Sequence, residues 1–126
     1  MASGDVRRYE ACAQSTTTFG RVLCSMRDQH MVVDGPVQNG CPGEAATPGE
    51  LFLGSLACCG VELTQVIARD QRLPLNSVRV AVSGTLDRSK PVRPDLTLFS
   101  AVRLDFHLKG VTEEQGARLI ETFKGR

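Results

Sequence analysis

The sequence predicts an α+β protein in which antiparallel strands surround one long helix. Three observations predict it: short strand-like patterns precede and follow an apolar helical segment, that segment opens on a capping motif, and a second capped helix closes the chain. With 126 residues, of which 41% are hydrophobic, the chain has the size of one ordinary domain. We therefore expect a single domain over residues 1–126.

The N-terminal part predicts two or three antiparallel strands. Residues 6–33 hold short runs of β-branched and apolar residues, which are broken by turn residues around Gly20 and at 27–29. Residues 34–50 contain four glycines and three prolines, a composition that excludes a regular element. We expect this second stretch to be a loop that leads into a helix.

The start of the helix is well defined by its residues. Thr47 offers a hydroxyl N-cap, Pro48 suits the first helical position, and Glu50 stands where a capping box needs its acidic residue. The helix should begin at Pro48 and run to about Arg69 or Asp70.

The surface of this helix predicts burial. Its first four turns are apolar on nearly every side, whereas a surface helix shows one apolar stripe. Glu62, Thr64 and Gln65 interrupt it, and we therefore expect a core helix and no membrane span. Gly54 and Gly60 would let other backbone approach closely.

The chain after the helix predicts a two-stranded hairpin and a second helix. Residues 78–83 alternate apolar and polar side chains, a turn-rich segment follows at 87–95, and residues 102–109 alternate again. Thr112 then begins a second capping box, and an apolar stripe continues to Lys124.

Composition excludes several classes of function. Fifteen basic residues against 14 acidic ones give no basic surface for nucleic acid, and with no tryptophan and one tyrosine the chain lacks an aromatic platform for stacking bases. The N-terminus is charged where a signal peptide would be apolar, so we expect a cytoplasmic protein. The five cysteines are an odd number in a chain without a secretion signal, which favours reduced thiols over a disulfide scaffold. With two histidines and no CxxC pair we expect no structural zinc site, and we expect no cofactor.

The order of elements and four segments resemble the OsmC/Ohr family of osmotically induced and organic hydroperoxide resistance proteins, in particular its OsmC-like branch. The family's central-helix motif has a proline, an acidic residue, leucines, small residues and then a cysteine. The resemblance implies an intertwined dimer with the long helices packed centrally between sheets that both chains share. The matching segments are TPGELFLGSLACCGVELTQVIA (47–68), GPVQNGCPGEA (35–45), SVRVAVSGTLD (77–87) and FSAVRLDFHLKGVTEEQGARLIETF (99–123).

The same resemblance implies a reaction centre at Cys59. Matching the motif places the family's peroxidatic cysteine there, and it implies an arginine, held by a glutamate, that supports the thiolate. Arg21 is the first candidate for this arginine and Arg27 the second. Glu50 occupies the glutamate position of the OsmC-like branch, whereas peroxidase-type members carry the glutamate where this chain has Gly49. The capping box alone would also explain Glu50, and a buried, inert Cys59 is the alternative to a reactive one.

The family's second, resolving cysteine is expected after the last helix. The sequence stops at Arg126, so either the chain continues or the protein lacks this cysteine. Cys12 and Cys24 on the N-terminal strands are conceivable substitutes. Cys58 is better explained as a small core residue, because adjacent cysteines form only strained disulfides. Cys41, in the glycine-rich loop, is expected to be exposed.

Three functions from different classes follow. The first is thiol-dependent reduction of organic hydroperoxides through Cys59, in a cytoplasmic homodimer that a dithiol reductant regenerates. Glu62, three residues after Cys59, argues against this function, because a carboxylate at this spacing disfavours the thiolate. The objection is removed if a cation neutralises Glu62 or if its carboxylate lies far from the thiol. The second is a non-catalytic OsmC-like dimer that binds an apolar small ligand between subunits, and a structural module of a larger assembly is a third. None of them involves nucleic acid or a membrane.

Overall fold

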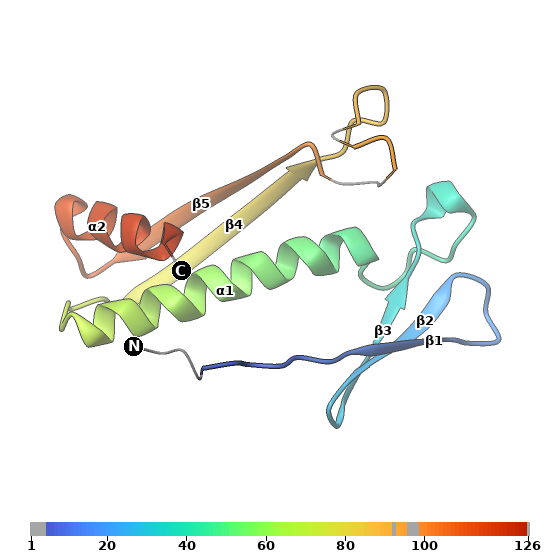
Figure 1. Ribbon diagram of the computed structural model, residues 1–126, viewed down its shortest axis with the longest axis horizontal. Helices are drawn as coiled ribbons and strands as arrows, with labels where there is room; N and C mark the ends of the chain where they lie inside the picture. The colour runs from blue at the N-terminus through green and yellow to red at the C-terminus, as the bar shows by residue number, and fades with distance from the viewer. Residues whose placement is uncertain (1–4, 92, 96–98, 126) are drawn as a thin grey trace. The chain divides into compact units, whose positions relative to one another are not determined.

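The computed structural model describes residues 5–91, 93–95 and 99–125 (Figure 1). The chain divides into two compact units, residues 1–51 and 52–126, and each is described by itself. Val92 of the expected turn segment, and Arg126, lie outside the described residues.

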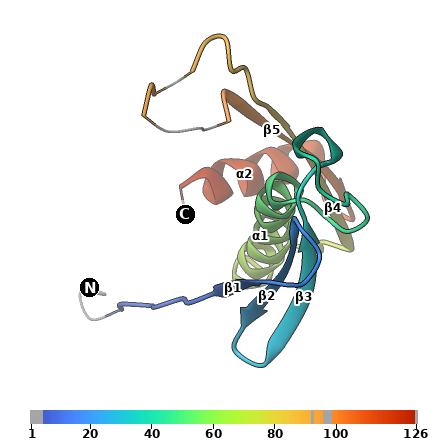
Figure 2. The ribbon, with the colours of Figure 1, turned by 90° about the vertical axis from the view of Figure 1, so that its right-hand side faces the viewer.

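The first unit contains a three-stranded antiparallel sheet. Strands β1 (Cys12–Ser15), β2 (Arg21–Met26) and β3 (Gln29–Asp34) lie in the order β1-β2-β3, as Figure 2 shows from the side. The β2–β3 turn has two residues, and the first of them, Arg27, has a φ of 54°. The prediction of two or three strands with a turn at 27–29 is confirmed, with three strands present.

The glycine- and proline-rich stretch is a loop, as expected. It contains one short 3₁₀ helix, η1 (Val37–Asn39), which ends at Gly40 in the left-handed region with a φ of 76°. Its two ends meet, because the backbone N–H of Asp34 donates to the carbonyl of Ala46 at 3.0 Å. The long helix α1 (Pro48–Asp70) begins directly after Thr47, at the predicted residue.

The second unit packs α1 and a shorter helix on a hairpin. Strands β4 (Ser77–Thr85) and β5 (Ala101–Lys109) pair antiparallel over their whole length, and α2 (Glu113–Lys124) follows. The predicted capping box at the start of α2 is present, with the Thr112 hydroxyl accepting from the N–H of Gln115. Ile67 and Ala68 of α1 form the core with Leu119 of α2.

The burial of α1 corrects one expectation. Within one chain it buries a single stripe, made of Gly60, Thr64, Ile67 and Ala68, and not its whole surface. At Gly60 the helix approaches the hairpin so closely that a Cβ would lie 3.2 Å from Val80. The other sides are exposed or half-exposed because one chain supplies neighbours for one side only. By length and composition alone α1 could cross a membrane, so its polar residues do not exclude a span by themselves.

Candidate functional site

Cys59 lies at the middle of α1, outside the buried stripe. At about 100° per residue it points some 80–100° away from Gly60 and Ile67. Its side chain is exposed in the chain, as is that of Cys58. The expectation of a buried thiol therefore does not hold for the single chain, because the stripe that packs on the hairpin runs along a neighbouring side of the helix.

Apolar side chains flank Cys59 along its own side of the helix. Phe52 and Val66 lie two turns before and after it, at about 20° from its direction, and Leu56 and Leu63 lie one turn away. Leu56, Leu63 and Val66 are half-buried, whereas Phe52 is 51% exposed. We call these five residues the Cys59 stripe. A reactant that reaches the Cys59 thiol along this stripe would contact apolar side chains.

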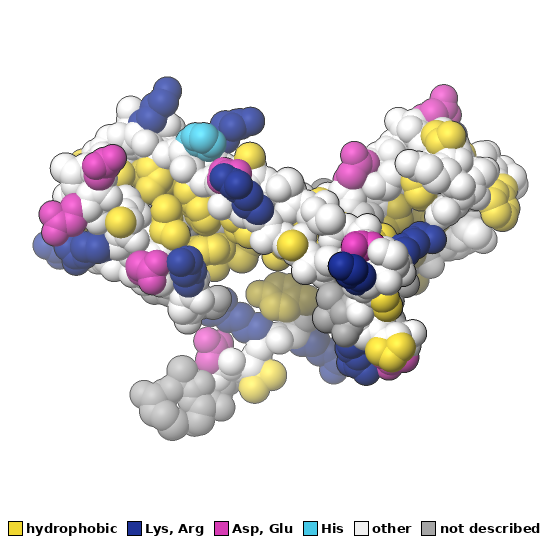
Figure 3. All heavy atoms as spheres, turned by 90° about the horizontal axis from the view of Figure 1, so that it is seen from above, with side chains coloured by type: hydrophobic (Ala, Val, Ile, Leu, Met, Phe, Trp, Pro, Cys, Tyr) yellow, Lys and Arg dark blue, Asp and Glu magenta, His cyan; other side chains and the backbone are white. Residues whose placement is uncertain are grey.

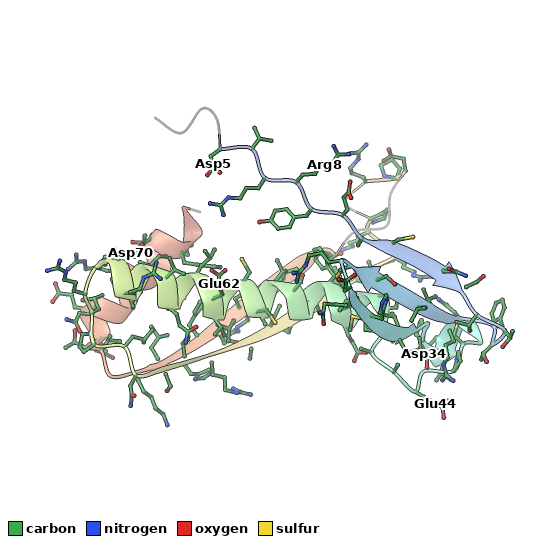
Figure 4. The ribbon with its side chains drawn as sticks, turned by 90° about the horizontal axis from the view of Figure 1, so that it is seen from below. Asp5, Arg8, Asp34, Glu44, Glu62 and Asp70 are labelled. Atoms are coloured by element: carbon green, nitrogen blue, oxygen red, sulfur yellow. The ribbon has the colours of Figure 1, made fainter. Side chains whose placement is uncertain are left out.

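Glu62 is the charged neighbour of the stripe. It is exposed and extends from α1 into solvent, as Figure 4 shows. Among residues 5–91, 93–95 and 99–125, no basic side chain forms an ion pair with it. No described ion pair therefore supplies a cation that would offset the Glu62 carboxylate near Cys59.

Arg21 makes the densest set of polar contacts in the first unit. Its Nε and one terminal nitrogen donate to the two carboxylate oxygens of Asp34, both at 2.8 Å, and that nitrogen also donates to Glu44 at 2.8 Å. Asp34 is fully buried and also accepts the backbone N–H groups of Glu44 and Ala45, at 2.9 and 3.0 Å. These donors hold the pKa of Asp34 far below its ordinary value, with the Arg21 guanidinium as the main cause, and the two carboxylates raise the pKa of Arg21 further.

Sequence reasoning missed Asp34. It selected Arg21 and expected a glutamate to hold it, but the principal partner is an aspartate at the end of β3. The Val-Val-Asp-Gly-Pro segment reads as a strand that ends in a turn, and only the spacing of the strands across the sheet brings Arg21 and Asp34 opposite each other. Pairing β2 with β3 in the correct register would have placed Asp34 opposite Arg21 and so revealed this contact.

Glu50 is engaged at the start of α1. Its carboxylate accepts the N–H and the hydroxyl of Thr47, at 2.9 and 3.0 Å, and its own N–H donates to that hydroxyl oxygen at 3.3 Å. The N–H and hydroxyl of Thr47 lower the pKa of Glu50. The capping interpretation of Glu50 is confirmed. The described hydrogen bonds of Arg21 go to Asp34 and Glu44 and do not reach Glu50, whose role beside a thiolate stays a prediction.

Cys41 is less accessible than expected. It is half-buried, with its side chain packed between the backbones of Gly20 and Gly35. A Cβ on Gly20 would lie 2.5 Å from the Cys41 Sγ, and the N–H of Gly35 donates to the Gly20 carbonyl at 2.8 Å. The expectation of an exposed loop thiol is wrong, because two glycines make room for it.

Cys12 and Cys24 lie on adjacent strands but on opposite faces of the sheet. Cys12 pairs with Ser25 and Cys24 pairs with Ala13, and directly paired residues point to the same face. These two thiols therefore cannot form a disulfide with each other without a change of register. Among the described residues, no three His, Cys, Asp or Glu side chains gather as metal ligands would.

The second unit thus defines a class of protein: a small α+β chain that presents a cysteine from an apolar stripe of its longest helix. A family model described as OsmC-like protein matches residues 41–126, which is most of the chain and includes all of α1. The chain belongs to the OsmC-like protein family. A comparison with curated proteins gave no match.

Solved structures of this family share the fold. An OsmC-like protein from Mycoplasma pneumoniae superposes with a TM-score of 0.80 at 15% identity, over 95% of this chain and 82% of that one. An organic hydroperoxide resistance protein OsmC from Legionella pneumophila gives 0.72 at 21% identity, over 94% and 82%.

A third solved structure, an organic hydroperoxide resistance protein from Elizabethkingia anophelis, gives a TM-score of 0.75 at 17% identity, over 98% and 84% of the two chains. A single helix that is long and apolar enough to cross a membrane, such as α1, is weak evidence for a span, because the core helix of a soluble protein passes the same test.

Proposed function

We propose that this protein reduces organic hydroperoxides through Cys59 and serves in the defence against oxidative stress. One observation carries the proposal: Cys59, which the resemblance of the sequence places at the family's motif position, is an exposed thiol in the middle of an apolar helix stripe. The names of the Legionella and Elizabethkingia proteins, which refer to organic hydroperoxide resistance, support the same reaction class.

The reaction begins with the thiolate of Cys59. The sulfur attacks one peroxide oxygen, the O–O bond breaks, and the alkoxide leaves and takes a proton to become an alcohol. Cys59 is then a sulfenic acid. One thiol of a dithiol reductant displaces its hydroxyl as water and forms a mixed disulfide, and the second thiol releases Cys59 and leaves the reductant as a disulfide.

A cation is needed to keep Cys59 in its reactive form, because an ordinary thiol with a pKa of about 8.5 is mostly protonated at neutral pH. We assign this role to Arg21, with Arg27 as the alternative. Asp34 and Glu44 hold the Arg21 guanidinium in a fixed orientation, which is what a positioned cation requires. Arg27 forms no ion pair with any residue that the structure describes.

The protein acts as a cytoplasmic homodimer in this proposal. One chain leaves much apolar surface uncovered, including the Cys59 stripe and an open groove between β5 and α2 that Phe106, Leu108, Val111 and Ile120 help to line. Figure 3 shows hydrophobic side chains gathered on the surface formed by α2 and β5. Apolar patches of this kind on a small chain indicate a protein interface. Light scattering that gives the mass of one chain would contradict the homodimer.

Oxidation of individual thiols tests the reaction. The reduced protein is mixed with cumene hydroperoxide, quenched with a thiol reagent, and the remaining free thiol at each cysteine is measured by peptide mass spectrometry. Cys59 should oxidise at least about tenfold faster than Cys58 and Cys12, which are also exposed, and the Cys59→Ser variant should lose peroxide consumption. Equal rates at Cys59 and Cys58 would refute a peroxidatic role.

A second function is favoured by the contacts of Arg21. Two carboxylates already neutralise this guanidinium, as in a structural ion pair, which leaves less positive charge for a thiolate. A non-catalytic dimer that binds an apolar small ligand would explain both this arrangement and the apolar Cys59 stripe. An unreactive Cys59, together with an apolar molecule that copurifies and is released by organic extraction, would favour this function over the first.

A further inference from the structure

The face of the β4–β5 hairpin that points away from the helices carries the polar side chains of both strands. Val80 and Phe106 belong to the opposite face, where a Cβ on Gly60 of α1 would lie 3.2 and 3.5 Å from them. Side chains alternate between the two faces of a strand, so the odd-numbered residues of Ser77–Thr85 and of Ala101–Lys109 lie on the outer face.

Four neighbouring positions of this outer face hold three basic residues and one hydroxyl. Arg79 lies directly opposite His107. Ser77 lies directly opposite Lys109, at the next outer position along the hairpin. We call these four residues the basic block, and all four are exposed. Opposite residues have Cβ atoms about 5 Å apart and residues two apart along a strand about 7 Å, so the four side chains surround a small rectangle.

The basic block has no carboxylate partner among residues 5–91, 93–95 and 99–125. None of the ion pairs within these ranges includes Arg79, His107 or Lys109. The next outer position on β5 holds Asp105, but its carboxylate accepts from the Nε of Arg103 at 3.1 and 3.2 Å. Like charges this close repel, so Arg79 and Lys109 cost the hairpin stability unless an anion lies between them.

We propose that the basic block binds a compact oxyanion, and that the chemistry of this ligand is a phosphate group. The Arg79 guanidinium is a planar fork of donors that suits two oxygens of one phosphate. Lys109 adds a second full charge, and the His107 ring and the Ser77 hydroxyl add further donors around the same anion. The site lies on the opposite side of the sheet from α1, so it is separate from the reaction proposed at Cys59.

The size of the block decides the class of ligand. Four donors around about 5 by 7 Å suit one phosphate group, whereas nucleic acid requires a row of phosphate contacts. The next outer positions end the cationic surface, because Ala81 lies opposite Asp105 and Asp105 binds Arg103. Inorganic phosphate and a small phosphate monoester share this chemistry, and separate titrations distinguish the two sources.

Nuclear magnetic resonance of the whole chain tests the site. Inorganic phosphate and glycerol phosphate are titrated separately at fixed pH and ionic strength, with chloride as the balancing ion. The ring signals of His107 should shift saturably, whereas those of His30, which is hydrogen-bonded to Ser25, should not. Tighter binding of the monoester would assign the site to a phosphorylated small molecule, and equal or weaker binding would assign it to free phosphate. A His107 response to neither compound would overturn the proposal.

Variants of the block separate binding from general screening. Arg79→Gln and Lys109→Gln should each weaken phosphate binding by about fivefold. Arg118→Gln is the matched control, because it removes the same charge from an exposed position on α2 and should leave the affinity unchanged. Equal losses in Arg79→Gln and Arg118→Gln would show that phosphate only screens the net charge, and would overturn the proposal.

Thermal unfolding gives a second readout. Phosphate should raise the Tm of the wild type more than chloride does at equal ionic strength, and the Arg79→Gln, Lys109→Gln double variant should lose this gain. Without phosphate, Arg79→Gln should keep or raise the Tm, since it removes a like-charge repulsion. A lower Tm in Arg79→Gln together with an unchanged phosphate response would mean that Arg79 has a structural role, and would refute the site.

Discussion

Replacing Thr64 by valine should stabilise the protein. Thr64 lies in the buried stripe of α1 with no exposed area, and its Oγ1 has no hydrogen-bond partner among the described residues. A buried hydroxyl without a partner costs about 1–3 kcal/mol, and valine replaces it with a methyl group of the same shape. Threonine and valine differ little in helix propensity. We therefore expect the free energy of unfolding to rise by about 1 kcal/mol, which corresponds to an increase in Tm of roughly 4 °C for a chain of this size.

Urea denaturation followed by circular dichroism measures this change. Thr64→Val should raise the midpoint at an unchanged m-value, so that the difference reports stability and not the compactness of the unfolded chain. Thr64→Ser is the matched control, because it keeps the hydroxyl and loses the methyl group, and it should lower the midpoint. If Thr64→Val instead loses 1 kcal/mol or more, the hydroxyl has a partner in solution and the reasoning fails.

Three further outcomes follow from the contacts of single residues. Asp34→Asn should weaken hydrogen-exchange protection in the loop after β3. The pKa of Asp34 is lowered in the folded protein, so the ionised carboxylate stabilises the fold above its ordinary pKa near 3.8, and this contribution is lost as the pH falls through the folded pKa. The free energy of unfolding of Asp34→Asn should therefore vary less with pH in the acid range than that of the wild type. Gly35→Ala should cost about 1–3 kcal/mol by overpacking against Cys41. Cys41→Ala should rescue it in part, because this change removes the Sγ but keeps a Cβ that would lie 2.9 Å away. Gly20→Ala should not be rescued, since its φ of 82° strains any side chain, and equal rescue of the two variants would refute this packing. Leu119→Ala should cost about 2–5 kcal/mol in thermal unfolding, and a cost below 1 kcal/mol would contradict its place in the core.

The sequence was sufficient wherever structure depends on neighbouring residues. Thr47 and Glu50 predicted the first residue of α1, and Thr112 predicted that of α2, because a capping box is satisfied within four residues. The alternation at 78–83 and 102–109 predicted β4 and β5 for the same reason, since it follows from the pleat of a strand.

The remaining features depend on contacts between distant residues. Asp34 becomes the main partner of Arg21 only through strand register, and Cys41 is shielded only because two glycines that are far apart in the sequence meet beside it. The burial of α1 shows the same limit. Its apolar surface indicates how much of the helix needs to be covered, but not whether the same chain covers it.

Hydrogen bonds from Asp34 to the end of the loop after β3 decide where extra residues can be inserted. Asp34 contacts three consecutive residues near the far end of the loop, through its side chain to Glu44 and Ala45 and through its N–H to Ala46. The loop is thus closed on itself immediately before Thr47 starts α1. Residues inserted around the exposed Gly40, where a Cβ would meet no neighbour within 4 Å, would add only loop-closure entropy, which grows slowly with length. An insertion next to Gly40 can therefore enlarge the loop without moving the start of the helix, whereas one between Ala46 and Thr47 would separate the helix cap from the sheet.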